Sequence, residues 1–101
     1  MIECNSIDEV RTNINNIDEQ IVKLIALRGG FVKQAAKFKK DSDDVKAPKR
    51  VEEVISKVKN IARLNDVNEE VVENVYRIMI DSFIKAEMKE FEKLKWKMNR
   101  F

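Results

Sequence analysis

The longest apolar pattern in the chain lies within its first 40 residues. Apolar side chains recur there at alternating steps of three and four residues, the spacing of one face of an amphipathic helix. The face reads Ile7, Val10, Ile14, Ile17, Ile21, Leu24, then Arg28 in place of an apolar residue, then Phe31, Ala35 and Phe38. Ser6 and Glu9 form a capping box before it, and Asp41-Ser42-Asp43-Asp44 interrupts it. We therefore predict a first helix from Ser6 to about Asp41.

Two more apolar stripes predict two more helices. The second helix begins near Pro48, which suits a first turn, and ends at Asn65-Asp66-Val67. Its stripe consists of Val51, Val54, Ile55, Val58, Ile61 and Ala62. The third helix is capped by Asp66 or Asn68. Its seam reads Tyr76, Ile80, Phe83, Glu87, Phe91, Leu94 and Met98. The predicted fold class is all-α, with three helices per chain.

The length of the first helix has a consequence for assembly. The chain has 101 residues, so we expect a single domain over residues 1–101. A helix from Ser6 to Asp41 spans roughly 54 Å, whereas a compact globule of this size has a radius of gyration of only about 13 Å. Such a helix cannot bury its whole seam inside one monomer. The sequence therefore predicts a homodimer.

The amino-acid composition argues against several classes of function and several kinds of catalysis. The net charge is only +2 with both signs interspersed, which does not favour nucleic acid, and no apolar run is long enough for a membrane helix. A single Cys4 and an N-terminus without an apolar leader fit a cytoplasmic protein. The chain has no His, and its only Gly-Gly pair lies inside a helical pattern. If the protein is an enzyme, we expect its chemistry to need little proton transfer and no metal.

Three cations are candidate site residues. Arg28 sits on the apolar seam, where a guanidinium is costly to bury without an anion. On a continuous helix, Lys39 lies about 20° from the same face and roughly 16 Å further along, so the pair predicts a site for a compact dianion. Arg11 precedes Arg28 by 17 residues, or roughly 25 Å of helix. One small ligand cannot touch both, so Arg11 is either an ordinary surface residue or serves a second copy of the site.

Each candidate also has an ordinary interpretation. Arg28 could be an arginine whose stem covers a dimer edge while its charge reaches water. Glu87, the polar exception in the third seam, could pair structurally with Arg28 or Lys39. Arg11 and Arg50, taken alone, are typical of a solvated surface.

The chain as a whole resembles the all-helical class of chorismate mutases and their relative, isochorismate-pyruvate lyase. The similar segments are R-x-x-I-x-x-I-D-x-x-I-V from Arg11 to Val22, Arg28 with residues 32–39, and Ala47-Pro48-Lys49-Arg50-Val51. The resemblance implies an intertwined homodimer with three helices per chain. It also implies two sites, each lined mostly by one chain and completed by Arg11 of the other.

The resemblance further implies roles for individual residues. Arg28 would hold one carboxylate of a small dicarboxylate substrate, and the partner's Arg11 would hold the other. Lys39 would donate to the ether oxygen whose bond breaks. Glu87, aimed at the same oxygen, would have to be protonated to help. Arg50 also lies at the implied site.

Val51 and Phe83 complete the implied set of substrate-binding residues, and the sequence around Val51 departs from most of the family. Typical bacterial mutases read D-x-x-R-E in this register, whereas this chain reads Ala47-x-x-Arg50-Val51, which resembles the lyase. Glu87 instead favours a mutase. The implied activity is the pericyclic conversion of chorismate to prephenate in aromatic amino-acid biosynthesis. The alternatives are cleavage of isochorismate to salicylate and pyruvate, and a non-catalytic helical dimerisation module.

Overall fold

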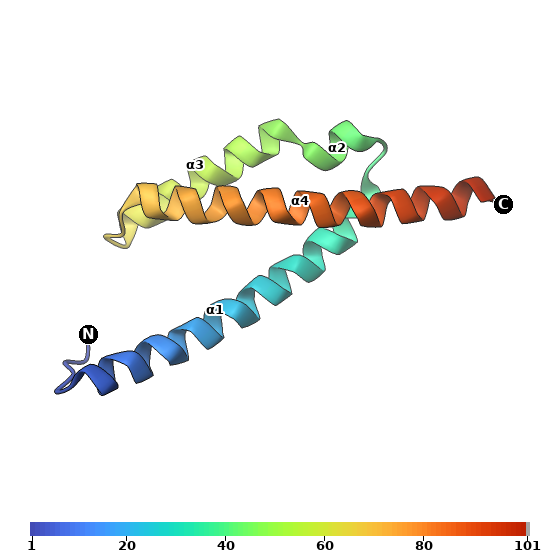
Figure 1. The fold of residues 1–101 in the computed structure, drawn as a ribbon. Coiled ribbons are helices and arrows are strands. Elements are labelled where there is room, and N and C mark those ends of the chain that lie inside the picture. Colours follow the sequence, from blue (N-terminus) through green and yellow to red (C-terminus); the bar gives the residue numbers. More distant parts are fainter. Residues whose placement is uncertain (101) are drawn as a thin grey trace. The chain divides into compact units, whose positions relative to one another are not determined.

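The structure is a computed structural model that describes the backbone of residues 1–100 and the side chains of residues 1–98. All regular secondary structure in its described part is helical (Figure 1). The elements are α1 (Ile7–Ala35), the short 3₁₀ helix η1 (Ala36–Phe38), α2 (Ser42–Lys46), α3 (Pro48–Leu64) and α4 (Glu69–Arg100). The all-α prediction with a long first helix is confirmed. The short α2 is an addition to the three predicted helices.

The chain divides into two compact units, Met1–Phe31 and the part from Val32 onward. Within the first unit α1 is the only helix, so the unit has no second element to cover the apolar stripe. The stripe is correspondingly open, with Ile14, Ile17 and Leu24 between 50% and 64% exposed. A helix with an apolar stripe is stable in water only when that stripe is covered. The stripe must therefore be covered from outside its own unit.

The predicted end of the first helix is wrong. The α-helix ends at Ala35, η1 adds one turn, and Lys39 is already extended, with φ −85° and ψ 138°. The cause is Asp41, whose side chain accepts the backbone N–H of Asp44 at 2.8 Å and so caps the start of α2. An N-cap residue has non-helical backbone angles, so one helix cannot run through it. Lys39 therefore does not lie on the same helix as Arg28, and the angular argument that joined them fails.

The beginnings of α3 and α4 agree with the sequence. Pro48 occupies the first turn of α3, and Asn68 caps α4 by accepting the Glu70 backbone N–H at 2.9 Å. Ala47, between α2 and α3, has left-handed backbone angles, with φ 38° and ψ 60°. These angles are unfavourable for any residue with a Cβ.

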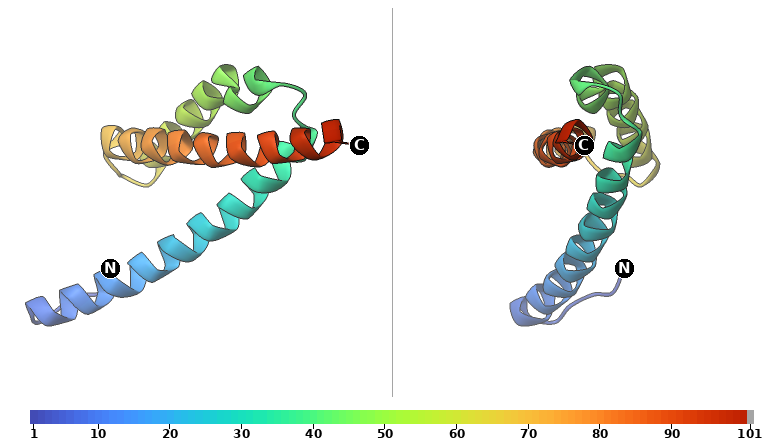
Figure 2. Two further views of the ribbon diagram at one scale, coloured as in Figure 1. Left: turned by 45° about the vertical axis from the view of Figure 1, so that its right-hand side comes forward. Right: turned by 90° about the vertical axis from the view of Figure 1, so that its right-hand side faces the viewer.

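The second unit is built on an antiparallel pair, α3 and α4, which stay side by side in all views (Figures 1 and 2). Its core, to which η1 and α2 also contribute, consists of Ala36, Val45, Ile55, Val58, Ala62, Ile80 and Phe91. Arg77 of α4 donates to both oxygens of Glu52 on α3, at 2.9 and 3.0 Å, and to Glu73 at 2.8 Å. This guanidinium lowers the pKa of both carboxyls. The pair is thus fixed by an apolar core and by charged contacts between the two helices, which also include Lys59 with Glu73 at 3.3 Å and Arg63 with Glu69 at 2.6 Å.

Across the described residues, no helix is both long and apolar enough to cross a membrane.

Candidate active site

Glu87 on α4 is the one buried charged side chain in the described part of the chain, with 7% of its surface exposed. Its Oε2 atom is fully buried and has no hydrogen-bond partner among the described residues. Burial raises the pKa of this carboxyl, and the nearby charge of Lys39 partly opposes the rise. The environment therefore shifts Glu87 towards its neutral form, which can donate a hydrogen bond.

The burial of Glu87 follows from its place on the inner face of α4. Ile80 and Phe91 lie seven residues before it and four residues after it, and both are buried. Phe83, one helical turn before Glu87, is half-buried. Both η1 and α2 pack on α4, so these short elements help to keep water from this face. The same helical repeat that builds the core thus removes a carboxyl group from solvent.

Lys39 reaches the neighbourhood of Glu87 from the segment between η1 and α2. It is half-buried, and its Nζ donates to the backbone oxygen of Asp44 at 3.1 Å. Among the described residues, the Lys39 ammonium is the one group whose charge lowers the pKa of Glu87. The structure therefore brings together the two residues that we expected to act on the ether oxygen, although Lys39 arrives by a different route.

Arg50 and Lys39 line one open groove of about 770 Å³ in the second unit. The lining residues are Ala35, Phe38, Lys39, Asp43, Asp44, Ala47, Pro48, Lys49, Arg50 and Glu53. Arg50 is exposed and pairs with Glu53 at 3.6 Å, a contact too solvated to hold the guanidinium firmly. Val51 and Phe83 are half-buried on α3 and α4, and like Glu87 they lie outside this lining set.

The two arginines of α1 belong to the first compact unit. Arg11 is exposed and Arg28 is half-buried. Since 17 residues of helix extend roughly 25 Å, α1 itself does not bring the two guanidinium groups together. That one substrate uses both arginines, one from each of two chains, stays a prediction.

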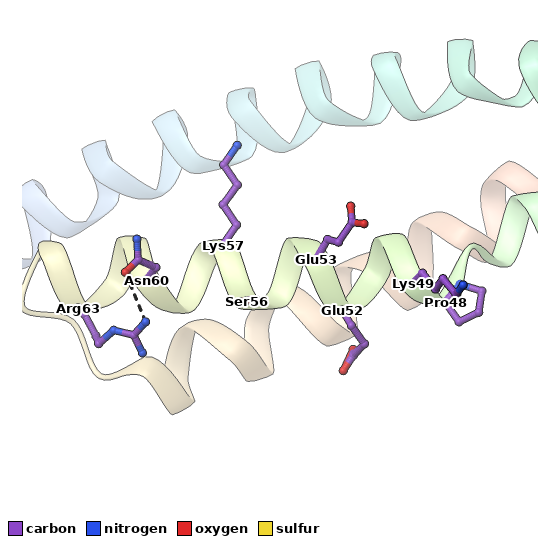
Figure 3. Close-up of a pocket in the computed structure, with 8 residues that line it drawn as sticks. All are labelled: Pro48, Lys49, Glu52, Glu53, Ser56, Lys57, Asn60 and Arg63. Atoms are coloured by element: carbon purple, nitrogen blue, oxygen red, sulfur yellow. Dashed lines mark hydrogen bonds between the residues drawn. The ribbon is translucent and has the colours of Figure 1, made fainter.

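A second hollow runs along one face of α3 (Figure 3). All of its lining residues come from that single helix: Pro48, Lys49, Glu52, Glu53, Ser56, Lys57, Asn60 and Arg63. Arg63 is engaged with Asn60 at 3.4 Å and Glu69 at 2.6 Å. None of the predicted site residues lines this hollow. It is a helix surface and not the candidate site.

Sequence reasoning missed Asp44, which contacts Lys39 through its backbone oxygen. A usable signal was present, because Asp41-x-x-Asp44 has the spacing of a capping box. We had interpreted these aspartates only as an interruption of the first helix.

Comparison of the sequence with known proteins identifies the family to which the chain is similar. The family model described as chorismate mutase type II matches residues 10–88. The isochorismate pyruvate lyase of Pseudomonas aeruginosa is 28% identical over 87 residues, 86% of each chain. The chorismate mutase of Methanocaldococcus jannaschii is 28% identical over 74 residues, 72% of this chain and 75% of that protein.

A third relative is longer. The bifunctional chorismate mutase/prephenate dehydratase of Buchnera aphidicola is 27% identical over 90 residues, 88% of this chain but only 23% of that protein. The chain thus spans less than a quarter of the length of this relative. The family match, by contrast, covers 79 of the 101 residues. On that match, the chain belongs to the chorismate mutase type II family.

Proposed function

We propose that the protein is a chorismate mutase, which rearranges chorismate to prephenate. The observation that carries the proposal is the buried carboxyl of Glu87, whose Oε2 has no hydrogen-bond partner among the described residues and whose pKa is influenced by the charge of Lys39. In a protein of this family, the pair supplies two hydrogen-bond donors without any His. A unimolecular pericyclic reaction needs no nucleophile and no cofactor, so donors and a shaped site suffice.

Lys39 and Glu87 would stabilise the charge that builds on the ether oxygen as its bond to carbon breaks. Lys39 donates as a cation, and Glu87 donates as a neutral acid. Preorganised hydrogen-bond donors stabilise the charge of the transition state more than that of the ground state. Removing one such donor typically lowers the rate by about 10²- to 10³-fold. We therefore expect Lys39→Ala to lower kcat by at least about 100-fold.

Arg28 and the partner's Arg11 would hold the two carboxylates of the substrate. Bidentate guanidinium contacts fix both the position and the orientation of a carboxylate. They would restrict a flexible dianion to its reactive conformer, a source of several kcal/mol of barrier lowering. Arg50, Val51 and Phe83 would complete the walls of the site.

Binding of a bicyclic dicarboxylate that mimics the transition state tests this proposal directly. Isothermal titration with wild type should show one site per chain. Arg28→Ala should weaken binding by about 10- to 100-fold, the value of a charge-assisted hydrogen bond. Lys23→Ala is the matched control, because Lys23 is an exposed α1 cation that pairs with Glu19. If wild type does not bind the mimic, the protein is a helical dimerisation module and not an enzyme.

A lyase acting on isochorismate is the second candidate. Its support is the apolar pair Ala47 and Val51, where typical mutases carry acids, and the likeness to the Pseudomonas lyase over 86% of each chain. Purified protein given chorismate and isochorismate separately distinguishes the two activities. Prephenate from chorismate supports the mutase. Salicylate and pyruvate from isochorismate, formed with a higher kcat/KM than prephenate from chorismate, would identify the protein as a lyase instead.

A further inference from the structure

Asp44 uses three of its polar groups to fix the segment that carries Lys39. Its N–H donates to the Asp41 side chain at 2.8 Å, and its Oδ2 accepts the Lys40 backbone N–H at 3.0 Å. Its backbone oxygen accepts from Lys39 Nζ at 3.1 Å. The two side-chain bonds form a reciprocal cap that closes residues 40–44 into one turn. The third bond ties the Lys39 ammonium to that turn.

We propose that Asp41 and Asp44 are positioning residues, which hold the Lys39 ammonium in place for the reaction. The proposal rests on the proposed function, because that function gives Lys39 its catalytic role. Neither aspartate is required to touch the substrate. Their effect is exerted through the backbone turn and through the single bond from Lys39 to Asp44.

The kind of acceptor supports this assignment. A lysine side chain is long and flexible, so an unrestrained ammonium samples many positions. A backbone oxygen fixes the ammonium without neutralising it, and it leaves two of the three N–H donors for other acceptors. A carboxylate in the same place would cancel the positive charge needed at the ether oxygen. The Asp44 carboxylate instead accepts from the Lys40 backbone.

Chemical labelling in the full chain tests the positioning without reference to turnover. The rate at which acetic anhydride modifies Lys39, relative to the exposed Lys46 of α2, is measured by mass spectrometry. Asp44→Ala should raise this ratio several-fold, because loss of the Asp44 carboxylate loosens the turn that presents the backbone oxygen to Lys39. Asp44→Asn keeps an acceptor oxygen for the Lys40 N–H and should stay near wild type. Ser42→Ala, a substitution in the same turn, is the control that should change nothing.

Kinetics then tests whether the positioning matters for the reaction. Asp44→Ala should lower kcat on the order of tenfold, with KM changed much less, since small misplacement of a catalytic group is costly. In a Lys39→Ala background the same substitution should change kcat by less than about twofold, because there is no ammonium left to position. Asp41→Ala removes the other half of the cap and should reproduce this pattern.

These experiments distinguish a failure of the proposed positioning of Lys39 from a failure of the proposed function. An unchanged labelling ratio in Asp44→Ala overturns the positioning, and so does an equal fall in kcat with and without Lys39. A wild-type protein that transforms neither chorismate nor isochorismate refutes the proposed function instead. In that case the labelling ratio still decides whether the cap holds Lys39.

Discussion

Replacing Glu87 with leucine should stabilise the protein while removing activity. The Glu87 side chain is only 7% exposed, and its Oε2 lacks a partner among the described residues. A buried polar atom without a hydrogen bond costs about 1–3 kcal/mol, and more when it is charged. Leucine has a similar size and adds apolar burial on a face already formed by Ile80 and Phe91. We expect Glu87→Leu to raise the free energy of unfolding by about 1–3 kcal/mol at neutral pH.

This gain should depend on pH with a defined sign. Burial raises the folded-state pKa of Glu87, so the folded state binds its proton more tightly than the unfolded state does. The wild type therefore loses stability as pH rises from the ordinary carboxyl pKa to the raised folded value, and levels off above it. Glu87→Leu has no such proton. Its advantage should be smallest below the ordinary carboxyl pKa, where only the missing hydrogen bond destabilises the wild type, grow through that window and stay constant above it.

Urea unfolding at one fixed protein concentration measures the effect, because a dimer's midpoint depends on concentration. Glu92→Leu on the exposed side of α4 is the control and should lie within about 0.5 kcal/mol of wild type. Activity supplies the second readout. Wild-type activity should fall as pH rises through the folded pKa of Glu87, whereas Glu87→Gln keeps a donor and should give a flatter profile. A destabilised Glu87→Leu, or identical pH profiles for wild type and Glu87→Gln, would refute the reasoning.

Three more predictions follow from other parts of the molecule. Arg77→Ala should lower Tm at neutral pH, and this loss should shrink as pH falls through the lowered folded-state pKa values of Glu52 and Glu73, because the two carboxyls then lose their charge. A loss of Tm that stays the same throughout an acid titration would contradict this. Ala47→Gly should raise the free energy of unfolding by up to about 1 kcal/mol in urea titrations, because glycine tolerates the left-handed backbone, and a clear loss would show that the alanine is not strained. The protein should sediment as a dimer. Mixing inactive Arg11→Ala and Arg28→Ala chains should restore activity in the heterodimers, because one of their two sites then has both arginines. Heterodimers without recovered activity would show that the two arginines do not share a site.

The helices could be predicted because their signals are local. Pro48 and Asn68 mark the beginnings of α3 and α4, and the seam around Glu87 follows the repeat of a single helix. The position of Lys39 could not be predicted in this way. An apolar repeat that continues through Phe38 favours more helix, whereas the cap at Asp41 favours a new start, and the structure follows the cap. Where two local signals of similar strength favour different backbone conformations, tertiary packing determines which conformation forms.

The candidate site was harder to predict, because its contacts are not local. The influence of Lys39 on Glu87 joins positions 48 residues apart and depends on how η1 and α2 pack on α4. The spacing Asp41-x-x-Asp44 could have indicated the turn at residues 40–44, but the bond from Lys39 to the Asp44 backbone oxygen depends on how that turn is folded. The apolar seams had already singled out Arg28, Lys39 and Glu87, and the resemblance to a family supplied their roles and the remaining residues of the site. The geometry supplied the reason why a carboxyl at position 87 can act as a donor.

Turnover of chorismate by the purified wild-type chain, measured beside Lys39→Ala, tests the central claim most directly. The loss of chorismate and the formation of prephenate are followed in the same sample, without added metal or cofactor. We expect stoichiometric prephenate from wild type and a rate at least about 100-fold lower from folded Lys39→Ala. Chorismate left unchanged by wild type, or prephenate formed equally fast by both proteins, would contradict it.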